Sequence, residues 1–434
     1  MLNKCKMGIK LIIRLLIFVL IGTVLMILVY LIPTNNIDNH VRNSAELFEK
    51  EGSYPSFSLP YCNSLRDNFT DAWMLLEASY YDEDNSNHIV SSMTNYRYGI
   101  EDLDPVPTII EHYKNNKDFD GKVLYGRYWN GYLTFLKPLL YLFDYSTIRY
   151  INIGFQIILF IVIVFLLYEK GLEIYVPPYI LTIFMAMPFA VVLNLQLTNC
   201  YTVFNIGILT LLMTKDRLED KIYYIFLCLG IVTAFIDLLS YPLVTFGIPA
   251  VIYFTLAKID GIKASCLKFL KIGFSWCLGY GGMWISKWIV GSIISGENLI
   301  LDGFNQFLYR TGSSFEKTGS SETFTIIQTI YKNLKYFLLT PITLIIGSFV
   351  VVMIVLIIKN IVKGKIEFRK IISISGPYLF LMIIPFIWYI LVRNHSAIHA
   401  YGLSNKELLI TTMSITFLLT RIYFYTRDIT INKS

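Results

Sequence analysis

The sequence predicts an all-α polytopic membrane protein of about ten transmembrane helices, with a large, mixed but mainly helical first extracytoplasmic loop. Of the 434 residues, 55% are hydrophobic and only 16% are charged, whereas a soluble domain carries about 25% charged residues. Apolar runs of about 20 residues, long enough to cross the hydrocarbon core as a helix, recur along the chain. The net charge of +6 comes mainly from short segments between these runs and is no sign of nucleic-acid binding.

Ten apolar runs are predicted to span the bilayer. They cover residues 11–32, 147–168, 174–193, 198–214, 222–238, 241–257, 268–292, 337–358, 371–392 and 407–425. The first run is too long for a cleaved signal peptide, so we interpret it as an uncleaved span. Five parts follow: a cytoplasmic N-terminus and first span (1–33), an extracytoplasmic loop with interfacial helices (34–146), spans two to seven (147–292), a second extracytoplasmic loop (293–336), and spans eight to ten with a cytoplasmic tail (337–434).

The positions of Lys and Arg predict the orientation. With the N-terminus inside, nearly every cluster of these residues falls in a cytoplasmic segment, including 4–10, 215–221, 258–271 and 359–370. The short outside connections 194–199 and 237–240 contain neither residue. This distribution follows the positive-inside rule. We therefore expect a multi-pass protein of the cell (plasma) membrane with both termini in the cytoplasm.

The first outside loop holds many of the acidic residues and two amphipathic stretches. The first stretch is NFTDAWMLLEASYYDED, residues 68–84. The second, GRYWNGYLTFLKPLLYLF, begins at Gly126 and repeats Trp129, Leu133, Leu136 and Leu140 at helical spacing. An aromatic-rich helix just before a span is suited to lie in the membrane interface.

Asp71 is the candidate catalytic residue. It lies among Trp73, Met74 and Leu75 in the first amphipathic stretch. Apolar surroundings raise the pKa of a carboxylate and suit it to act as a general base or acid. The alternative is a structural role, because Asp near a helix N-terminus caps free N–H groups and complements the helix dipole.

Two segments at the outer ends of spans supply candidate binding residues. The segment FIDLLSYPLVTFGIP contains Asp237 close to the bilayer boundary and Tyr241 before a helix-breaking proline. An ionisable group at this depth is a functional candidate, with a helix cap as the alternative. The segment WYILVRNHSAIHAY contains Arg393, His395 and His399. The two histidines lack the glutamate of a zinc-protease motif, and we interpret the three residues as phosphate ligands at headgroup level or as interfacial anchors.

Arg127, Lys137 and Lys287 complete the list of candidates, and Lys137, on the predicted interfacial helix, has the same two interpretations as Lys287. Lys287 lies within a predicted span, in GMWISKWIVG, and either contacts an anionic ligand or extends to the interface. No metal site is assigned, and no cofactor is predicted. The acidic run Asp82–Asp84 is the candidate for binding a divalent cation. It lacks the glycine and the terminal glutamate of a calcium-binding EF-hand.

The strings FTDAWML, GRYWNGYLTFLKPLL, DLLSYPLVTFGIP and NHSAIHAY are similar to bacterial membrane proteins of surface-polysaccharide synthesis. The whole arrangement resembles the C-fold (GT-C) class of integral-membrane glycosyltransferases. This resemblance implies an inverting enzyme that moves a sugar from a polyprenyl-phosphate donor to a glycan or lipid-linked acceptor on the outer face. It also implies a base in the first outside loop, a role that Asp71 matches. The expected partners are this donor, this acceptor and membrane lipids.

Three other classes remain as alternatives. A surface-polysaccharide polymerase has a similar number of spans, but its large outside loop usually comes later in the chain and relies on arginine. A lipid or solute transporter predicts paired charges at mid-membrane depth and repeat symmetry, and the sequence has neither. A structural or sensory protein leaves the polar clustering on one side unexplained.

Overall fold

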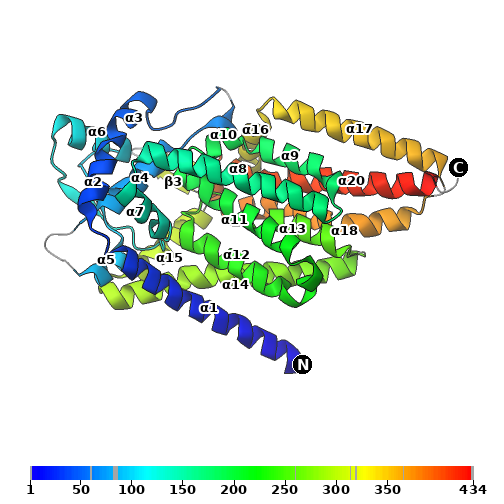
Figure 1. Ribbon diagram of the computed structural model, residues 1–434, viewed down its shortest axis with the longest axis horizontal. Coiled ribbons are helices and arrows are strands. Elements are labelled where there is room, and N and C mark those ends of the chain that lie inside the picture. The colour runs from blue at the N-terminus through cyan, green and yellow to red at the C-terminus, as the bar shows by residue number, and fades with distance from the viewer. Residues whose placement is uncertain are drawn as a thin grey trace.

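The computed structural model is an elongated helical bundle with a smaller helical cap at one end (Figure 1). It describes residues 2–58, 61–81, 87–259, 261–312, 314–317, 320–364 and 366–431. Within these residues the strands form only two two-stranded antiparallel sheets, β1–β2 and β3–β4. The predicted all-α class is therefore confirmed.

The cap is formed by residues 30–144 and contains the first predicted outside loop. Its elements are α2 (Thr34–Arg42), α3 (Ser44–Glu51), η1 (Cys62–Ser64), α4 (Asn68–Ser79), α5 (His88–Thr94), β1 (Arg97–Gly99), α6 (Pro105–Asn115), β2 (Gly121–Val123) and α7 (Leu133–Leu142). Their apolar side chains form one hydrophobic core together with side chains of α1. This core includes Phe48, Leu75 and Trp129. Both chain ends lie away from the cap (Figure 1).

The bundle contains the longer helices. Its elements are α1 (Leu2–Val29), α8 (Tyr145–Glu169), η2 (Glu173–Tyr175), α9 (Val176–Met185), α10 (Pro188–Val191), α11 (Leu195–Met213), η3 (Lys215–Arg217), α12 (Leu218–Ile236), α13 (Val244–Ala257), α14 (Ile262–Ser295), α15 (Leu299–Thr311), β3 (Ser314–Lys317), β4 (Ser320–Thr323), α16 (Ile326–Leu338), α17 (Ile342–Lys363), α18 (Phe368–Leu391), α19 (Arg393–Ile398), η4 (Ser404–Leu408) and α20 (Leu409–Ile431).

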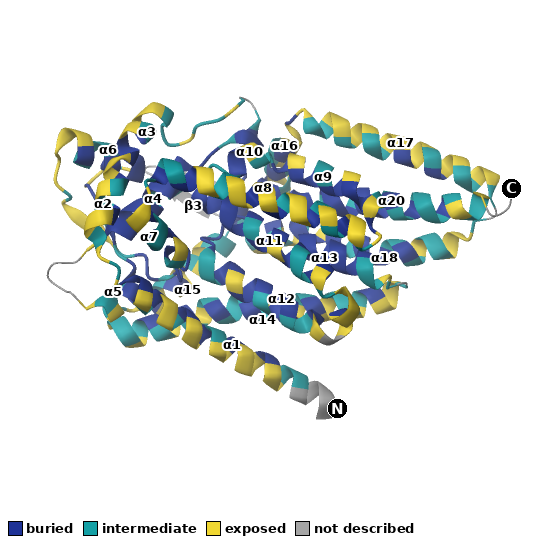
Figure 2. Ribbon diagram, viewed as in Figure 1, coloured by how far each residue is buried: buried dark blue, intermediate teal, exposed yellow. Residues whose placement is uncertain are grey.

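Six helices in the described part of the chain are long and apolar enough to cross a membrane. They are Met7–Val29, Tyr145–Glu169, Leu195–Met213, Ile342–Lys363, Phe368–Leu391 and Ser404–Ile431. In Figure 2 the outward faces of α1, α8 and α17 are largely exposed, and only 11% of the apolar window of α17 is buried. Exposed apolar surface of this extent is consistent with a membrane protein. The count of ten spans remains a prediction.

Several predicted elements have different bounds in the structure; the predicted span 337–358, for example, crosses the break between the end of α16 at Leu338 and the start of α17 at Ile342. The predicted span 174–193 is interrupted, because α9 ends at Met185 and Met187 adopts a left-handed conformation (φ 54°) before Pro188 starts α10. The predicted interfacial helix from Gly126 begins only at Leu133, and Trp129 is buried with its indole N–H donating to the carbonyl of Met283 at 2.7 Å. Trp129 therefore joins the cap to α14.

Candidate functional site

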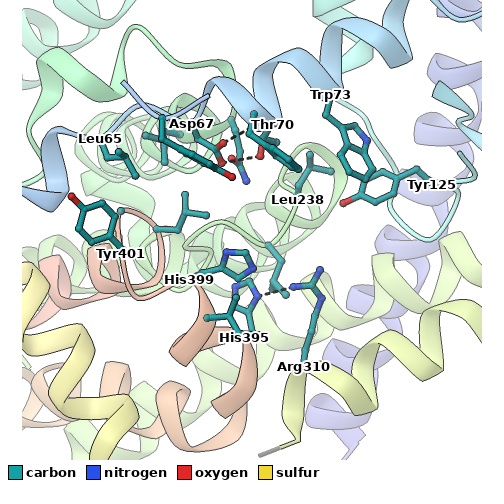
Figure 3. A pocket seen from close by; sticks show the side chains of 18 residues that line it. Leu65, Asp67, Thr70, Trp73, Tyr125, Leu238, Arg310, His395, His399 and Tyr401 are labelled. Atoms are coloured by element: carbon teal, nitrogen blue, oxygen red, sulfur yellow. Dashed lines mark hydrogen bonds between the residues drawn. The ribbon is translucent and has the colours of Figure 1, made fainter. Parts of the chain in front are cut away.

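A cavity of about 500 Å³ lies where the cap meets the bundle (Figure 3). The start of α4, Tyr125 and the start of α11 contribute to its wall. The turn after α12, the end of α15, and α19 with the segment after it complete the wall. Its lining residues are Tyr54, Leu65, Asp67, Phe69, Thr70, Trp73, Tyr125, Gln196, Leu197, Leu238, Leu239, Arg310, His395, Ile398, His399, Tyr401, Gly402 and Leu403. The cavity brings together the carboxylate of Asp67, the guanidinium of Arg310 and the imidazoles of two histidines, His395 and His399.

Asp67 contributes the only carboxylate of this wall. It is the N-cap residue of α4: Oδ1 accepts from the backbone N–H of Thr70 at 3.0 Å, and Oδ2 accepts from the Thr70 hydroxyl at 2.8 Å. Burial raises the pKa of Asp67, and the two hydrogen bonds oppose that shift. A carboxylate has about four acceptor positions, so two hydrogen bonds leave Asp67 the capacity to accept a further proton or hydroxyl.

Arg310 and His395 lie across the cavity from Asp67 (Figure 3). Arg310 donates to Nδ1 of His395 at 2.7 Å and to the hydroxyl of Tyr128 at 2.8 Å. Because a guanidinium can only donate, Nδ1 of His395 has no proton and Nε2 has one. Burial, His399 and Arg310 all lower the pKa of His395. His395 is therefore neutral, and its remaining ring N–H is hydrogen-bonded to the backbone carbonyl of Leu239.

His399 stands beside His395, with ring centroids 4.6 Å apart. Burial, aided by Arg310, lowers the pKa of His399 to about 4. The positive charge of the cavity therefore comes from Arg310, while both imidazoles are neutral near pH 7.

Backbone contacts explain why Arg310 and His395 meet although they are 85 positions apart in the sequence. The N–H of Asn394 donates to the carbonyl of Gly312 at 3.1 Å, and its side-chain amide donates to the carbonyl of Tyr309 at 2.9 Å. These bonds join the start of α19 to the end of α15. The two predicted outer segments, 293–336 and the end of span nine, thus contribute to one site.

Aromatic rings form the remaining wall near Asp67. Trp73 and Tyr125 lie with ring centroids 4.6 Å apart, and Tyr54 stacks on Phe69 at 6.0 Å. Flat aromatic faces offer apolar area of fixed geometry with a polar edge. This surface suits the C–H face of a sugar ring.

Asp71, the predicted base, does not line the cavity. Its carboxylate is fully buried and accepts from the N–H groups of Leu195 at 2.9 Å and Gln196 at 3.1 Å, and also from the hydroxyl of Tyr145. Burial raises the pKa of Asp71 to about 7 against these hydrogen bonds. These contacts favour the alternative role of Asp71 as a helix cap. Asp71 caps the N-terminus of α11, however, and not that of its own helix.

A charged network continues behind Asp71 and fixes the start of α4. Arg149 donates to Tyr145 at 2.8 Å and to Asn68 at 2.8 Å, and it forms an ion pair with Glu51 at 3.0 Å. Because Asn68 follows Asp67 directly, this network holds Asp67 in its position on the cavity wall.

Asp237 and Tyr241 lie behind the wall and not on it. Asp237 accepts from the N–H of Ser240 at 3.0 Å and from its hydroxyl, while the Tyr241 hydroxyl donates to the carbonyl of Leu197. These bonds stabilise the turn after α12, in which Leu239 adopts φ 68° and contributes to the cavity lining. Both residues therefore shape the cavity from outside.

The remaining predicted phosphate ligands are elsewhere. Arg127 forms an ion pair with Asp302 at 3.2 Å. Lys287 is buried and donates to the carbonyl of Met93 at 3.0 Å and to Asn95 at 2.8 Å. Arg393 does not line the cavity, although it begins α19. Of the predicted site residues, the structure brings only His395 and His399 into the cavity.

Sequence reasoning missed Asp67, Arg310 and Tyr401. Asp67 immediately precedes the quoted stretch 68–84 and had a readable signal, because Asp followed by a helical pattern is an N-cap signature. No signal in the sequence indicated Arg310, because its partner His395 is distant in sequence. No group of three or more potential metal ligands occurs in the described residues, and Asp82–Asp84 lies outside them.

In comparisons with protein-family models, curated proteins and solved structures, none matches this chain.

Proposed function

We propose that this chain is a membrane glycosyltransferase that uses a polyprenyl-phosphate sugar and acts in the cavity at the cap–bundle junction. One observation carries the proposal: a buried carboxylate, Asp67, lies across one cavity from the Arg310–His395–His399 cluster. Transfer of a sugar from a phosphate to a hydroxyl needs a base on one side of the sugar and anion-stabilising donors on the other.

In the proposed reaction, Asp67 takes the part that the sequence suggested for Asp71. The acceptor oxygen attacks the anomeric carbon of the donor sugar while its proton passes to Asp67. The bond between that carbon and the phosphate oxygen breaks with inversion, and its electron pair stays on the leaving polyprenyl phosphate. General-base catalysis contributes about 10²–10⁴-fold, and alignment of the two reactants contributes the rest.

Arg310 is the proposed donor to the leaving phosphate, and His395 holds it in position. The guanidinium supplies a permanent positive charge, and Nδ1 of His395 accepts one of its N–H groups. Donors fixed before the reaction stabilise charge that develops in the transition state. Charged hydrogen bonds of this kind contribute about 1.5–3 kcal/mol each.

An apolar groove of about 1050 Å³ supports binding of a long lipid chain. Residues of α1, α13, α14 and α18 line it, among them Trp276, Leu243 and Leu391. Leu391 is four residues before His395, and Leu243 is four residues after Leu239, which lines the cavity. We propose that a polyprenyl chain in this groove directs its phosphate towards the cavity.

The proposal includes the membrane arrangement expected from the sequence. We propose that α12, α13 and α14 complete the set of about ten spans with the six long apolar helices and the interrupted segment 174–193. The cap and the cavity then face the outside of the plasma membrane, where a glycan or lipid-linked acceptor is available. We assign no metal or other cofactor to this reaction.

The experiment that tests the proposal is turnover of polyprenyl-phosphate hexoses and pentoses by the purified chain in nanodiscs, with glycan and lipid-linked acceptors supplied, measured as release of polyprenyl phosphate. Arg310→Gln removes the charge and is expected to lower kcat/KM by roughly tenfold to a hundredfold, since 1.4 kcal/mol corresponds to tenfold. Arg369→Gln changes an exposed arginine of α18 and is the control. Unchanged kcat/KM in Arg310→Gln, or no turnover of any donor, contradicts the proposal.

A polysaccharide polymerase is the second candidate, because the arginine of the cavity comes from the later outside segment 293–336. This function requires a lipid-linked oligosaccharide as donor. Turnover of such a donor without turnover of monosaccharide donors favours the polymerase.

A further inference from the structure

A second cavity, of about 330 Å³, lies at the end of the cap where α1 enters it. The end of α1, the start of α2 and parts of α5 and α7 enclose it. Its lining residues are Tyr30, Leu31, Ile32, Pro33, Thr34, Asn35, Tyr80, Tyr81, His88, Ser91 and Lys137. None of them lines the candidate active site, so the cavity needs an explanation of its own.

The side chain of Lys137 lines this cavity although the residue is only 1% exposed. Its ammonium group donates no hydrogen bond to any residue that the structure describes, and it lies 4.5 Å from the centroid of the Tyr30 ring. A buried ammonium group normally has hydrogen-bonded partners, because removing a charge from water is costly. The missing partner is therefore expected inside the cavity.

The N-terminus of α2 contributes to the same cavity through Thr34 and Asn35. No side chain caps this helix, whose N-cap residue is Pro33. The first N–H groups of a helix have no partner within it, and the helix dipole makes this end favourable for anions. The helix end and Lys137 thus favour the same kind of ligand by independent means.

The charges around Lys137 also favour an anion. Glu77 is the buried carboxylate that interacts with it, and the same carboxylate interacts with Lys287 and Arg97. Glu77 accepts a hydrogen bond from Tyr132 and none from the three cations. Burial raises the pKa of Glu77 to about 8, so near pH 7 this carboxyl group is largely protonated and does not balance the charge of Lys137.

We propose that this cavity binds a phosphate group, held by Lys137 and the N-terminus of α2. Leu31, Ile32 and Pro33 follow the first membrane-spanning helix directly, and lipid headgroups lie at this level. The phosphate of an anionic phospholipid is therefore one source, and free inorganic phosphate is the other. Ser91 and His88 offer further donors from α5.

The first test is retention of lipid and binding of phosphate by the full chain. In nanodiscs of phosphatidylglycerol or phosphatidylcholine, native mass spectrometry counts retained lipids. In detergent, inorganic phosphate is titrated while thermal unfolding is followed. Lys137→Met is expected to weaken binding at least tenfold, Lys137→Arg to preserve it, and Lys50→Met, on the exposed face of α3, to leave it unchanged.

A second measurement does not depend on the folding of Lys137→Met. Burial lowers the pKa of Lys137 to about 8, so a small acylating reagent reacts with its neutral amine in the wild-type chain. Protection by phosphatidylglycerol alone supports the site with a lipid source, and protection by inorganic phosphate supports it with a soluble source. Labelling that neither probe changes, or equal binding by Lys137→Met, overturns the proposal.

Discussion

Asp67 and Asp71 are four residues apart at the start of one helix, and their surroundings give them different roles. Asp71 has backbone N–H donors from α11 and a tyrosine hydroxyl, which occupy its carboxylate. Asp67 has only Thr70 as a partner and lies on the cavity wall. The sequence indicated an aspartate in apolar surroundings near this helix start. It could not distinguish the two, because the backbone donors that occupy Asp71 come from α11, more than 100 positions away.

The pH dependence of transfer is predicted at this same scale. A base must be deprotonated, and burial raises the pKa of Asp67 above its ordinary value of 3.8. The acid limb of kcat/KM is therefore expected above that value, with activity increasing as pH rises. Rate measurements across pH check this, and an acid limb at or below the ordinary value contradicts it.

The contribution of Asp67 to folding stability depends on pH in the opposite direction to its contribution to activity. The folded chain binds the proton more tightly than the unfolded chain, so ionisation destabilises the fold. This contribution is most favourable below the unfolded pKa and is lost as pH rises through the folded pKa. The difference in melting temperature between the wild-type chain and Asp67→Asn should therefore decrease as pH rises.

At the scale of elements, close contact between α12 and α14 supports the bundle beneath the site. A Cβ atom at Gly279 would lie 2.3 Å from the carbonyl oxygen of Leu227, and one at Gly230 would lie 2.2 Å from that of Trp276. The two helix backbones thus touch at two glycines. The sequence predicted both helices from their apolar runs, but it gave no sign of which glycines face the partner helix.

Gly279→Ala is expected to lower the free energy of unfolding by about 1–3 kcal/mol, since overpacking displaces one backbone from the other. Gly281→Ala is the matched control in the same helix, because a Cβ atom there meets nothing within 4 Å. It should be neutral or stabilise by about 0.5–1 kcal/mol. Thermal unfolding in one detergent compares the two variants, and equal melting temperatures contradict the close contact.

At the scale of the whole molecule, composition was sufficient to predict the helical membrane class, and local patterns were insufficient to assemble the site. The cavity is lined by residues of α4, α11, α15, α19 and the segment after α19. Apolar runs predict spans one at a time, whereas the cavity depends on how these elements pack together. The broken segment at Met187 likewise depends on backbone conformation that hydropathy does not report.

The proposed orientation predicts which residues an impermeant thiol reagent reaches in intact cells. A cysteine replacing Lys50, which is exposed on the cap, should react without permeabilisation. A cysteine replacing Arg217, which is exposed in η3 at a predicted cytoplasmic connection, should react only after permeabilisation. The reverse pattern would place the cap in the cytoplasm. It would exclude transfer to an acceptor on the outer face of the membrane.

The most direct test of the central claim is the turnover of polyprenyl-phosphate sugar by Asp67→Asn. Asparagine caps a helix about as well as aspartate, so this variant should keep the melting temperature of the wild-type chain. It should lose about 10²–10⁴-fold in kcat. Asp144→Asn is the control, because Asp144 caps α8 in the same way, accepting from Thr147 at 2.7 Å, and does not line the cavity. Full turnover by a folded Asp67→Asn, with turnover lost in a folded Asp71→Asn, would return the base to Asp71 and contradict the assignment made here.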